Sequence, residues 1–189
     1  MLFEALLMSN LRIELDRSVA IRDPIKNIEY VNTLRNNIPH SIKLLEESDF
    51  TKNFYPNYNC YMFALDLLNS KEVDQKAQST LGRVRPGNDF IKYLLNQEVL
   101  KEINFAELKF DDIIIYFDQN NPLHAGKVRS GKVISKWTIY GHLWEHGIDE
   151  VPLCFGSNRK YFRNISRALA VQSFSEYAKC KNNDGQHVN

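Results

Sequence analysis

Three segments of the chain carry clear hydrophobic patterns. Apolar residues over 60–68 recur at helical spacing and also fill much of the other side, which predicts a helix buried nearly all round. A one-sided apolar stripe over 88–99 predicts a second helix. Residues 112–117 form an unbroken apolar run rich in isoleucine, which is typical of a central strand covered on both faces.

After the central strand the pattern indicates a hairpin. Residues 124–128 and 132–137 are two short apolar runs, and the connection over 129–131 contains Gly131. Helical patterns therefore come first and sheet patterns second. This order predicts an α+β protein with an antiparallel sheet.

The chain has no internal repeat or low-complexity linker, so we expect one domain with additions. Residues 1–50 are interpreted as an N-terminal elaboration that contains a short capped helix at 41–47. Residues 51–175 are expected to form the catalytic domain, with a polar surface excursion over 71–87. Residues 176–189 are expected to be a disordered tail.

Composition narrows the range of partners. The 24 basic and 23 acidic residues give a net charge of +1, so electrostatics provides no argument for binding nucleic acid or an anionic membrane. The N-terminal segment lacks the basic start of a signal peptide and is too short to span a bilayer. Three cysteines suit a reducing compartment. We therefore expect a cytoplasmic protein as synthesised, with export by a signal-less route left open.

Cys60 is the strongest candidate for chemistry. It lies where a loop rich in Pro, Asn and Tyr meets the apolar helix, and Asn59 is available as the helix N-cap. A thiol in the first helical turn faces unpaired backbone N–H groups, which favour the thiolate. A cysteine nucleophile also needs a base, and His124 opens a strand directly after the central strand and its turn.

The order of these elements resembles a known group. Asn-Cys before an apolar helix, then a buried strand ending in Tyr116-Phe117, a turn and His124-Ala125-Gly126 is similar to the papain-like fold of NlpC-type cell-wall peptidases and CHAP amidases. The resemblance covers roughly residues 55–137. It implies a nucleophile helix packed on a small antiparallel sheet, with Cys60 as nucleophile, His124 as general base and no cofactor.

The resemblance also implies a third catalytic residue and an oxyanion hole. The orienting residue falls at Ser135 or Lys136, and neither is the His, Asn or Glu usual in that group; we take Ser135 and expect Lys136 to be solvated. The oxyanion hole would use the Cys60 N–H and a donor from Tyr58 or Asn59. Three further residues are assigned to substrate binding because they lie beside the catalytic strands: Trp137, His142 and His146.

Residues 142–146 also spell H-x-x-E-H, the zinc-binding string of inverted zinc peptidases. Such a site needs a long rigid helix, whereas Gly141 and Gly147 bracket the string and leave barely one turn. The sequence therefore favours an ordinary polar turn here and predicts no metal site.

These residues predict a cysteine peptidase or amidase that cleaves an amide or isopeptide bond of a peptide or protein through an acyl-thioester. A deamidase or acyltransferase would use the same two residues, Cys60 and His124. Outside that class, the alternative is a non-catalytic binding protein of the same fold in which Cys60 is a small buried hydrophobe.

Overall fold

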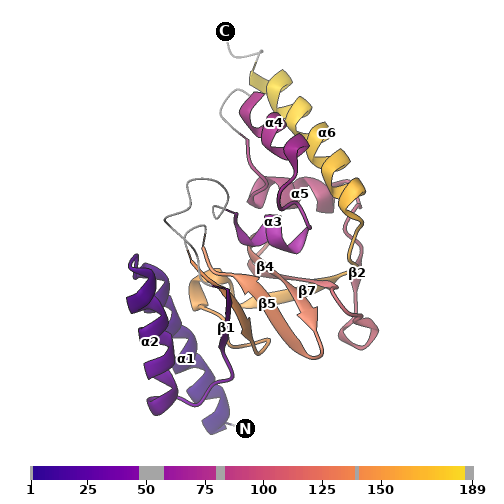
Figure 1. Ribbon diagram of the computed structural model, residues 1–189. Helices are drawn as coiled ribbons and strands as arrows, with labels where there is room; N and C mark the ends of the chain where they lie inside the picture. Colours follow the sequence, from indigo (N-terminus) through magenta and orange to yellow (C-terminus); the bar gives the residue numbers. More distant parts are fainter. Residues whose placement is uncertain (1, 47–57, 80–83, 139–140, 186–189) are drawn as a thin grey trace.

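The computed structural model describes residues 2–46, 58–79, 84–138 and 141–185 (Figure 1). Within these ranges the chain forms six α-helices and one seven-stranded antiparallel sheet. The predicted α+β class is confirmed.

The sheet is built around the predicted central strand. Its strands are β1 (Lys43–Glu46), β2 (Glu102–Ile103), β3 (Ile113–Asp118), β4 (Asn121–Arg129), β5 (Lys132–Lys136), β6 (Leu143–His146) and β7 (Asn158–Phe162), in the spatial order β1-β6-β5-β4-β3-β7-β2. β3 pairs with β4 on one side and β7 on the other, and all its residues except Asp118 are buried. A continuous apolar run is what such a strand requires.

The β4–β5 hairpin confirms the connection expected over 129–131. Ser130 and Gly131 have positive φ values of 48° and 77°, as a two-residue turn between twisted antiparallel strands needs. Gly126 matters for a different reason. A Cβ atom there would lie 2.7 Å from Cγ1 of Val133 and 2.8 Å from the carbonyl oxygen of Ile134, so the close passage of β5 over β4 depends on glycine.

Helices cover both faces of the sheet (Figure 1). α1 (Leu2–Ala20) and α2 (Pro24–Asn37) lie side by side near one end of the molecule, whereas α3 (Cys60–Ala64), α4 (Lys71–Ser79), α5 (Asn88–Asn96) and α6 (Arg167–Gly185) gather at the other. Two short 3₁₀ helices complete the described elements, η1 (Phe105–Glu107) and η2 (Leu153–Phe155).

The two faces of the sheet contribute to two separate cores. Ile113 and Ile115 of β3 pack in one core with Cys60 of α3, and we call this the α3 face. Ile114 and Tyr116 pack in the other core with residues of α1 and α2, and we call this the α1 face. The alternation of strand side chains therefore assigns each residue of β3 and β4 to one core or the other.

Two local predictions are wrong and a third is refined. The segment 41–47 holds strand β1 instead of a helix, because Lys43 and Leu44 pair with β6; residue 47 lies outside the described part of the chain. The helix predicted over 60–68 ends at Ala64, since Asp66 adopts a left-handed conformation with φ of 54°. The surface excursion expected over 71–87 begins as the helix α4, of which Val73 is buried, and residues 80–83 lie outside the described part of the chain.

The chain ends are more ordered than expected. α6 continues to Gly185, Tyr177 on it is buried in the α3-face core, and Ala178 is 1% exposed, so the expected disordered tail over 176–189 is wrong as far as residue 185. The remaining residues, 186–189, lie outside the described ranges. At the other end, Leu11 and Leu15 of α1 are fully buried in the α1-face core, so residues 1–50 help to build that core.

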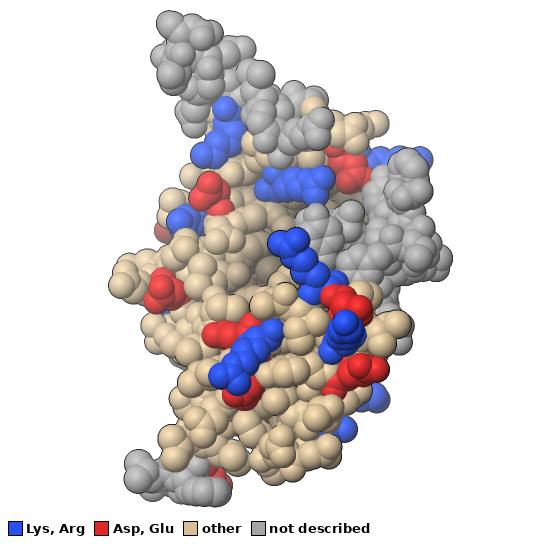
Figure 2. Space-filling model, turned by 90° about the vertical axis from the view of Figure 1, so that its left-hand side faces the viewer, with Lys and Arg blue, Asp and Glu red and all other residues tan. Residues whose placement is uncertain are grey.

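The surface carries both signs of charge close together. On the face drawn in Figure 2, basic and acidic side chains are interspersed, and exposed ion pairs include Lys160–Glu102 at 2.8 Å. Within the described ranges, no helix has both the length and the apolar character needed to cross a bilayer. The expected absence of nucleic-acid and membrane partners and the compartment stay predictions.

We expect Asp112 to be a principal anchor of β3. Its carboxylate is 1% exposed and accepts hydrogen bonds from the backbone N–H of Lys109 at 2.7 Å, that of Asn164 at 3.0 Å, and Nη1 of Arg163 at 2.6 Å. Asp112→Ala strands these donors and should lower the free energy of urea unfolding by about 3 kcal/mol. The control Glu102→Ala breaks an exposed pair and should cost under about 0.5 kcal/mol. Equal effects of the two variants would contradict the assignment.

Candidate functional site

Cys60 is the first residue of α3, as predicted, and Asn59 caps the helix. Asn59 has extended backbone angles (φ −99°, ψ 176°), and its side chain accepts a hydrogen bond from the N–H of Met62 at 2.9 Å. Its Nδ2 donates to the carbonyl oxygen of Pro86 at 2.6 Å. Both ends of the Asn59 amide are thus occupied by structural bonds, which leaves it poorly placed as the expected oxyanion donor.

The Cys60 thiol is buried in the α3-face core, with 8% of the residue exposed. Burial raises the pKa of the thiol to about 12, while hydrogen bonds with the backbone of Ala125, Tyr61 and Cys60 itself act in the opposite direction. Desolvation therefore outweighs the stabilisation that the helix N-terminus provides. The expected preformed thiolate is absent at neutral pH.

His124 lies on the other side of the sheet. In the register of β3 and β4, His124 is opposite Tyr116, an α1-face residue, whereas Ala125 is opposite Ile115, an α3-face residue. Neighbouring residues of a strand point to opposite faces. Cys60, which contacts the Ala125 backbone, and His124 are therefore separated by the sheet, and the structure does not bring the predicted pair together.

The His124 ring is enclosed. The residue is 1% exposed, its ring stacks on that of Phe155 with centroids 4.1 Å apart, and its Nε2 has no hydrogen-bond partner among the described residues. Burial, with a smaller contribution from His146, holds the pKa of His124 well below its usual value. The imidazole is neutral at pH 7.

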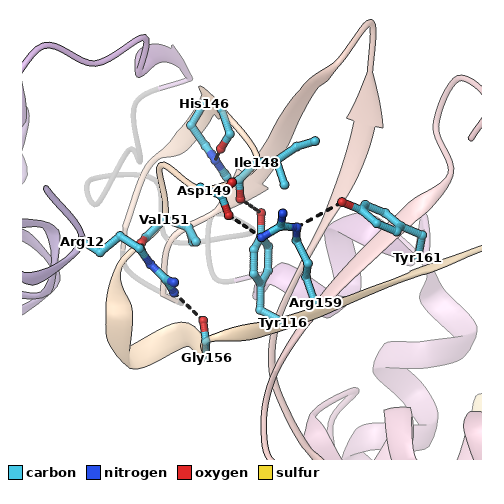
Figure 3. A network of polar contacts seen from close by, with 10 residues as sticks. Arg12, Tyr116, His146, Ile148, Asp149, Val151, Gly156, Arg159 and Tyr161 are labelled. Atoms are coloured by element: carbon cyan, nitrogen blue, oxygen red, sulfur yellow. Dashed lines mark hydrogen bonds and ion pairs between the residues drawn. The ribbon is translucent and has the colours of Figure 1, made fainter. Parts of the chain in front are cut away.

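The loop that carries Phe155 is held in place by polar contacts (Figure 3). The loop over 147–156 is held from α1 by Arg12, which donates to the carbonyl oxygens of Val151 at 3.0 Å and of Gly156. From β3, the Tyr116 hydroxyl donates to the carbonyl oxygen of Ile148 at 2.8 Å. These bonds hold the loop that places Phe155 over His124.

Ser135 hydrogen-bonds to His146 and not to His124, the residue it was expected to orient. Its Oγ lies 2.8 Å from Nε2 of His146 and accepts a hydrogen bond from Nε1 of Trp137 at 3.1 Å. Nδ1 of His146 lies 2.7 Å from the carbonyl oxygen of Gly147. A carbonyl oxygen only accepts, so Nδ1 carries the proton and Nε2 accepts from the Ser135 hydroxyl.

This network belongs to the core. Ser135 and His146 are fully buried and Trp137 is 2% exposed, and burial lowers the pKa of His146 to about 4. Trp137 packs against Trp144 with ring centroids 5.4 Å apart. The expected roles of Ser135 in catalysis and of Trp137 and His146 in substrate binding therefore find no support in the geometry, because their polar atoms bond to one another or to the backbone.

His142 is also structural. It is 1% exposed, and its Nε2 lies 3.1 Å from the carbonyl oxygen of Pro24 at the start of α2. The H-x-x-E-H string enters strand β6, which ends at His146, and so forms neither the zinc-binding helix nor the expected turn. The zinc motif needs the one-turn spacing of a helix, whereas an extended chain separates residues four apart by about 13 Å. Among the described residues, no three or more His, Cys, Asp or Glu side chains gather as a metal site.

Two buried lysines on the α3 face were not anticipated. Lys136, expected to be solvated, is 2% exposed, and its Nζ lies 4.5 Å from the centroid of the Tyr58 ring. Lys127 is 3% exposed, and its Nζ lies 2.6 Å from Oδ1 of Asp66. A lysine in an otherwise apolar strand is the sequence signal that could have pointed to them.

The structure thus divides the predicted site into two groups. Tyr58, Asn59 and Cys60 lie together at the start of α3. The residues of the other group lie in or beside the α1-face core: His124, Ser135, Trp137, His142 and His146. Comparison with models of known protein families, with curated proteins and with solved structures gives no match.

The buried histidines should make the fold sensitive to acid. The pKa of His146 is about 4 in the folded protein, against about 6.5 in an unfolded chain. The unfolded state takes up the proton first as the pH falls below about 6.5, so stability present above that value is lost on acidification. Between pH 7 and 5, His146 alone should lower the free energy of urea unfolding by about 2 kcal/mol, and His124 acts in the same direction.

The matched variant is His146→Gln, which keeps a polar side chain but cannot titrate. Between pH 7 and 5, the free energy of unfolding of this variant should fall by about 2 kcal/mol less than that of the wild type. An unchanged pH dependence in this variant would show that His146 is not a buried neutral group.

Proposed function

We propose that this chain is a cysteine hydrolase of papain-like architecture that cleaves an amide or isopeptide bond of a peptide or protein through an acyl-thioester at Cys60. One observation carries the proposal. Cys60 begins a helix packed on an antiparallel sheet, and backbone groups of Ala125, Tyr61 and Cys60 hydrogen-bond to its sulfur. Such donors stabilise negative charge at the reacting atoms.

In the proposed reaction the Cys60 sulfur loses its proton and forms a bond to the carbonyl carbon, while the C–N bond breaks and the amine leaves with a proton. Water then cleaves the thioester, which releases the carboxylic acid and restores the thiol. The reaction consumes only water and requires no cofactor. An amine in place of water would give acyl transfer, and a side-chain amide substrate would give deamidation.

The proton must leave Cys60 without help from His124. The imidazole is on the other face of the sheet, and with a thiol pKa of about 12 Cys60 is protonated at neutral pH in the free protein. The proton acceptor or the charge that favours its departure must therefore act on the α3 face as the bond forms.

A second candidate is favoured by the same burial. With 8% of Cys60 exposed and its thiol pKa raised, Cys60 also fits a structural core residue in a non-catalytic binding protein. The two candidates differ in whether a carbonyl compound can acylate the Cys60 sulfur and whether water then removes the acyl group.

We expect p-nitrophenyl acetate, an activated ester, to acetylate Cys60 and to be turned over. Peptide mass mapping locates the acetyl group, and p-nitrophenol release measures turnover. Cys60→Ala should abolish turnover, whereas Cys180→Ala, which removes an exposed thiol, should leave it unchanged. Acetylation confined to Cys154 and Cys180, without turnover, would contradict the hydrolase and favour a structural role for Cys60.

His124→Asn tests the separation of the two residues by the sheet. Since His124 does not face the thiol, the acetylation rate of Cys60 at pH 7.5 should stay within about twofold of the wild type. Circular dichroism would confirm that the variant is folded. If acetylation of Cys60 is tenfold or more slower in a folded variant, His124 must contact Cys60 in solution, which would require a different register of β4.

A further inference from the structure

The loop over 147–156 rests on a buried histidine at each end. At its start, Nδ1 of His146, the last residue of β6, lies 2.7 Å from the carbonyl oxygen of Gly147. Near its end, the ring of Phe155 stacks on that of His124, with the centroids 4.1 Å apart. Both histidines are at most 1% exposed. Each end of the loop therefore contacts an imidazole that is shielded from solvent.

The hydrogen bonds of His146 fit only the neutral ring. Its proton is on Nδ1, and its Nε2 accepts from the hydroxyl of Ser135 at 2.8 Å, while the Ser135 oxygen accepts from Nε1 of Trp137 at 3.1 Å. A second proton would turn Nε2 into a donor. The Ser135 oxygen would then accept two hydrogen bonds, and its own hydrogen would lose its acceptor in a fully buried position.

His124 is also matched to the neutral state. Its Nε2 is buried and has no hydrogen-bond partner among the described residues. Because an imidazolium carries a donor on both nitrogens, protonation would leave a charged N–H group unpaired in the core. The His124 and His146 rings also interact electrostatically, so a proton on one opposes a proton on the other. Each charged ring is accommodated best where it reaches water.

We propose that the loop over 147–156 is a conformational switch that opens in acid: protonation of His124 or His146 releases it from the α1 face while the sheet stays folded. In the open state water solvates the charge of both imidazoles, and the ring of Phe155 leaves the core. The switch lies across the sheet from Cys60 and does not depend on the reaction proposed there.

The loop should open before the sheet does. β3 is paired with a strand on each side, and all its residues except Asp118 are buried. The loop, in contrast, lies at the surface, where Leu153 is 41% exposed. Local opening of such a segment costs less free energy than unfolding of the whole domain.

Two anchors of the loop do not titrate between pH 7 and 5 (Figure 3). Arg12 of α1 donates to the carbonyl oxygens of Val151 and Gly156, and arginine keeps its charge throughout this range. The Tyr116 hydroxyl donates to the carbonyl oxygen of Ile148. Burial raises the pKa of Tyr116, so this phenol stays protonated in acid. These contacts oppose opening equally at both pH values.

Glu150 forms a third anchor. Burial acts to raise the pKa of Glu150, but hydrogen bonds with Ser41 and Gly147 lower it overall, so the carboxylate stays charged at pH 5. The other titratable or charged side chains around the loop and the two histidines are Asp16, His40, Lys132, Asp149, Cys154, Arg159 and Tyr161. The test therefore compares variants in which a single histidine is changed.

The test is amide hydrogen exchange in the full chain, followed by NMR at pH 7 and 5 in low concentrations of urea. The amides of Phe155 and Gly156, which donate within the loop, report on its opening, and that of Ile115 reports on β3. The pKa of His146 is about 4 in the closed loop and about 6.5 once exposed, so closed-state stability present above about pH 6.5 is lost in acid. Corrected for intrinsic exchange, loop protection should fall about twentyfold or more between pH 7 and 5. Urea should accelerate exchange in β3 much more than in the loop.

Three variants assign the effect. In His146→Gln the fall in loop protection between pH 7 and 5 should be about twentyfold smaller than in wild type. His124→Asn should act in the same direction, and it is the second variant in case His146→Gln does not fold. His40→Gln is the matched control, because it removes a histidine whose ring bonds to the backbone of Val31 and Ile42 outside the loop. Its fall in loop protection should stay within about threefold of wild type.

Two results would overturn the proposal. The first is loop protection that does not change between pH 7 and 5, or that falls as much in folded His146→Gln and His124→Asn as in wild type. The second is loop exchange at pH 5 with the same rate and urea dependence as exchange in β3, because the loop would then open only when the whole domain unfolds.

Discussion

The alternation of side chains along β4 is the constraint on which the functional interpretation depends. Both faces of the sheet are covered by helices, so every residue of this strand is committed to one core or the other. Ala125 faces α3 and its neighbour His124 faces the loop over 147–156. No rotamer change can carry the His124 side chain from one face of the sheet to the other. Only a shift of the strand register by one residue would exchange the two faces.

Competition between burial and local donors decides the state of Cys60. The start of a helix favours an anion by at most about 2 kcal/mol, and α3 is only five residues long. Removing a thiolate from water costs more, so the balance raises the pKa of the thiol to about 12. The same reasoning explains the neutral imidazoles of His124 and His146, where burial is again the largest cause.

Sequence patterns predicted the elements better than their relations. The apolar run of β3, the glycine-containing turn before β5 and the Asn59 cap each have a local cause, and each was found where the pattern indicated. The face of the sheet toward which the His124 side chain points depends on how β4 pairs with its neighbouring strands. The local hydrophobic pattern of the sequence does not encode this pairing. α6 was missed because the tail was judged by its polar end, although Phe174 and Tyr177 already followed helical spacing.

The position of Cys60 on the α3 face links the fold to the proposed chemistry. Its sulfur lies against the backbone of Ala125, and the sheet separates it from His124. A group that takes up the thiol proton must therefore act from the α3 face. On this argument the histidines across the sheet are parts of the scaffold.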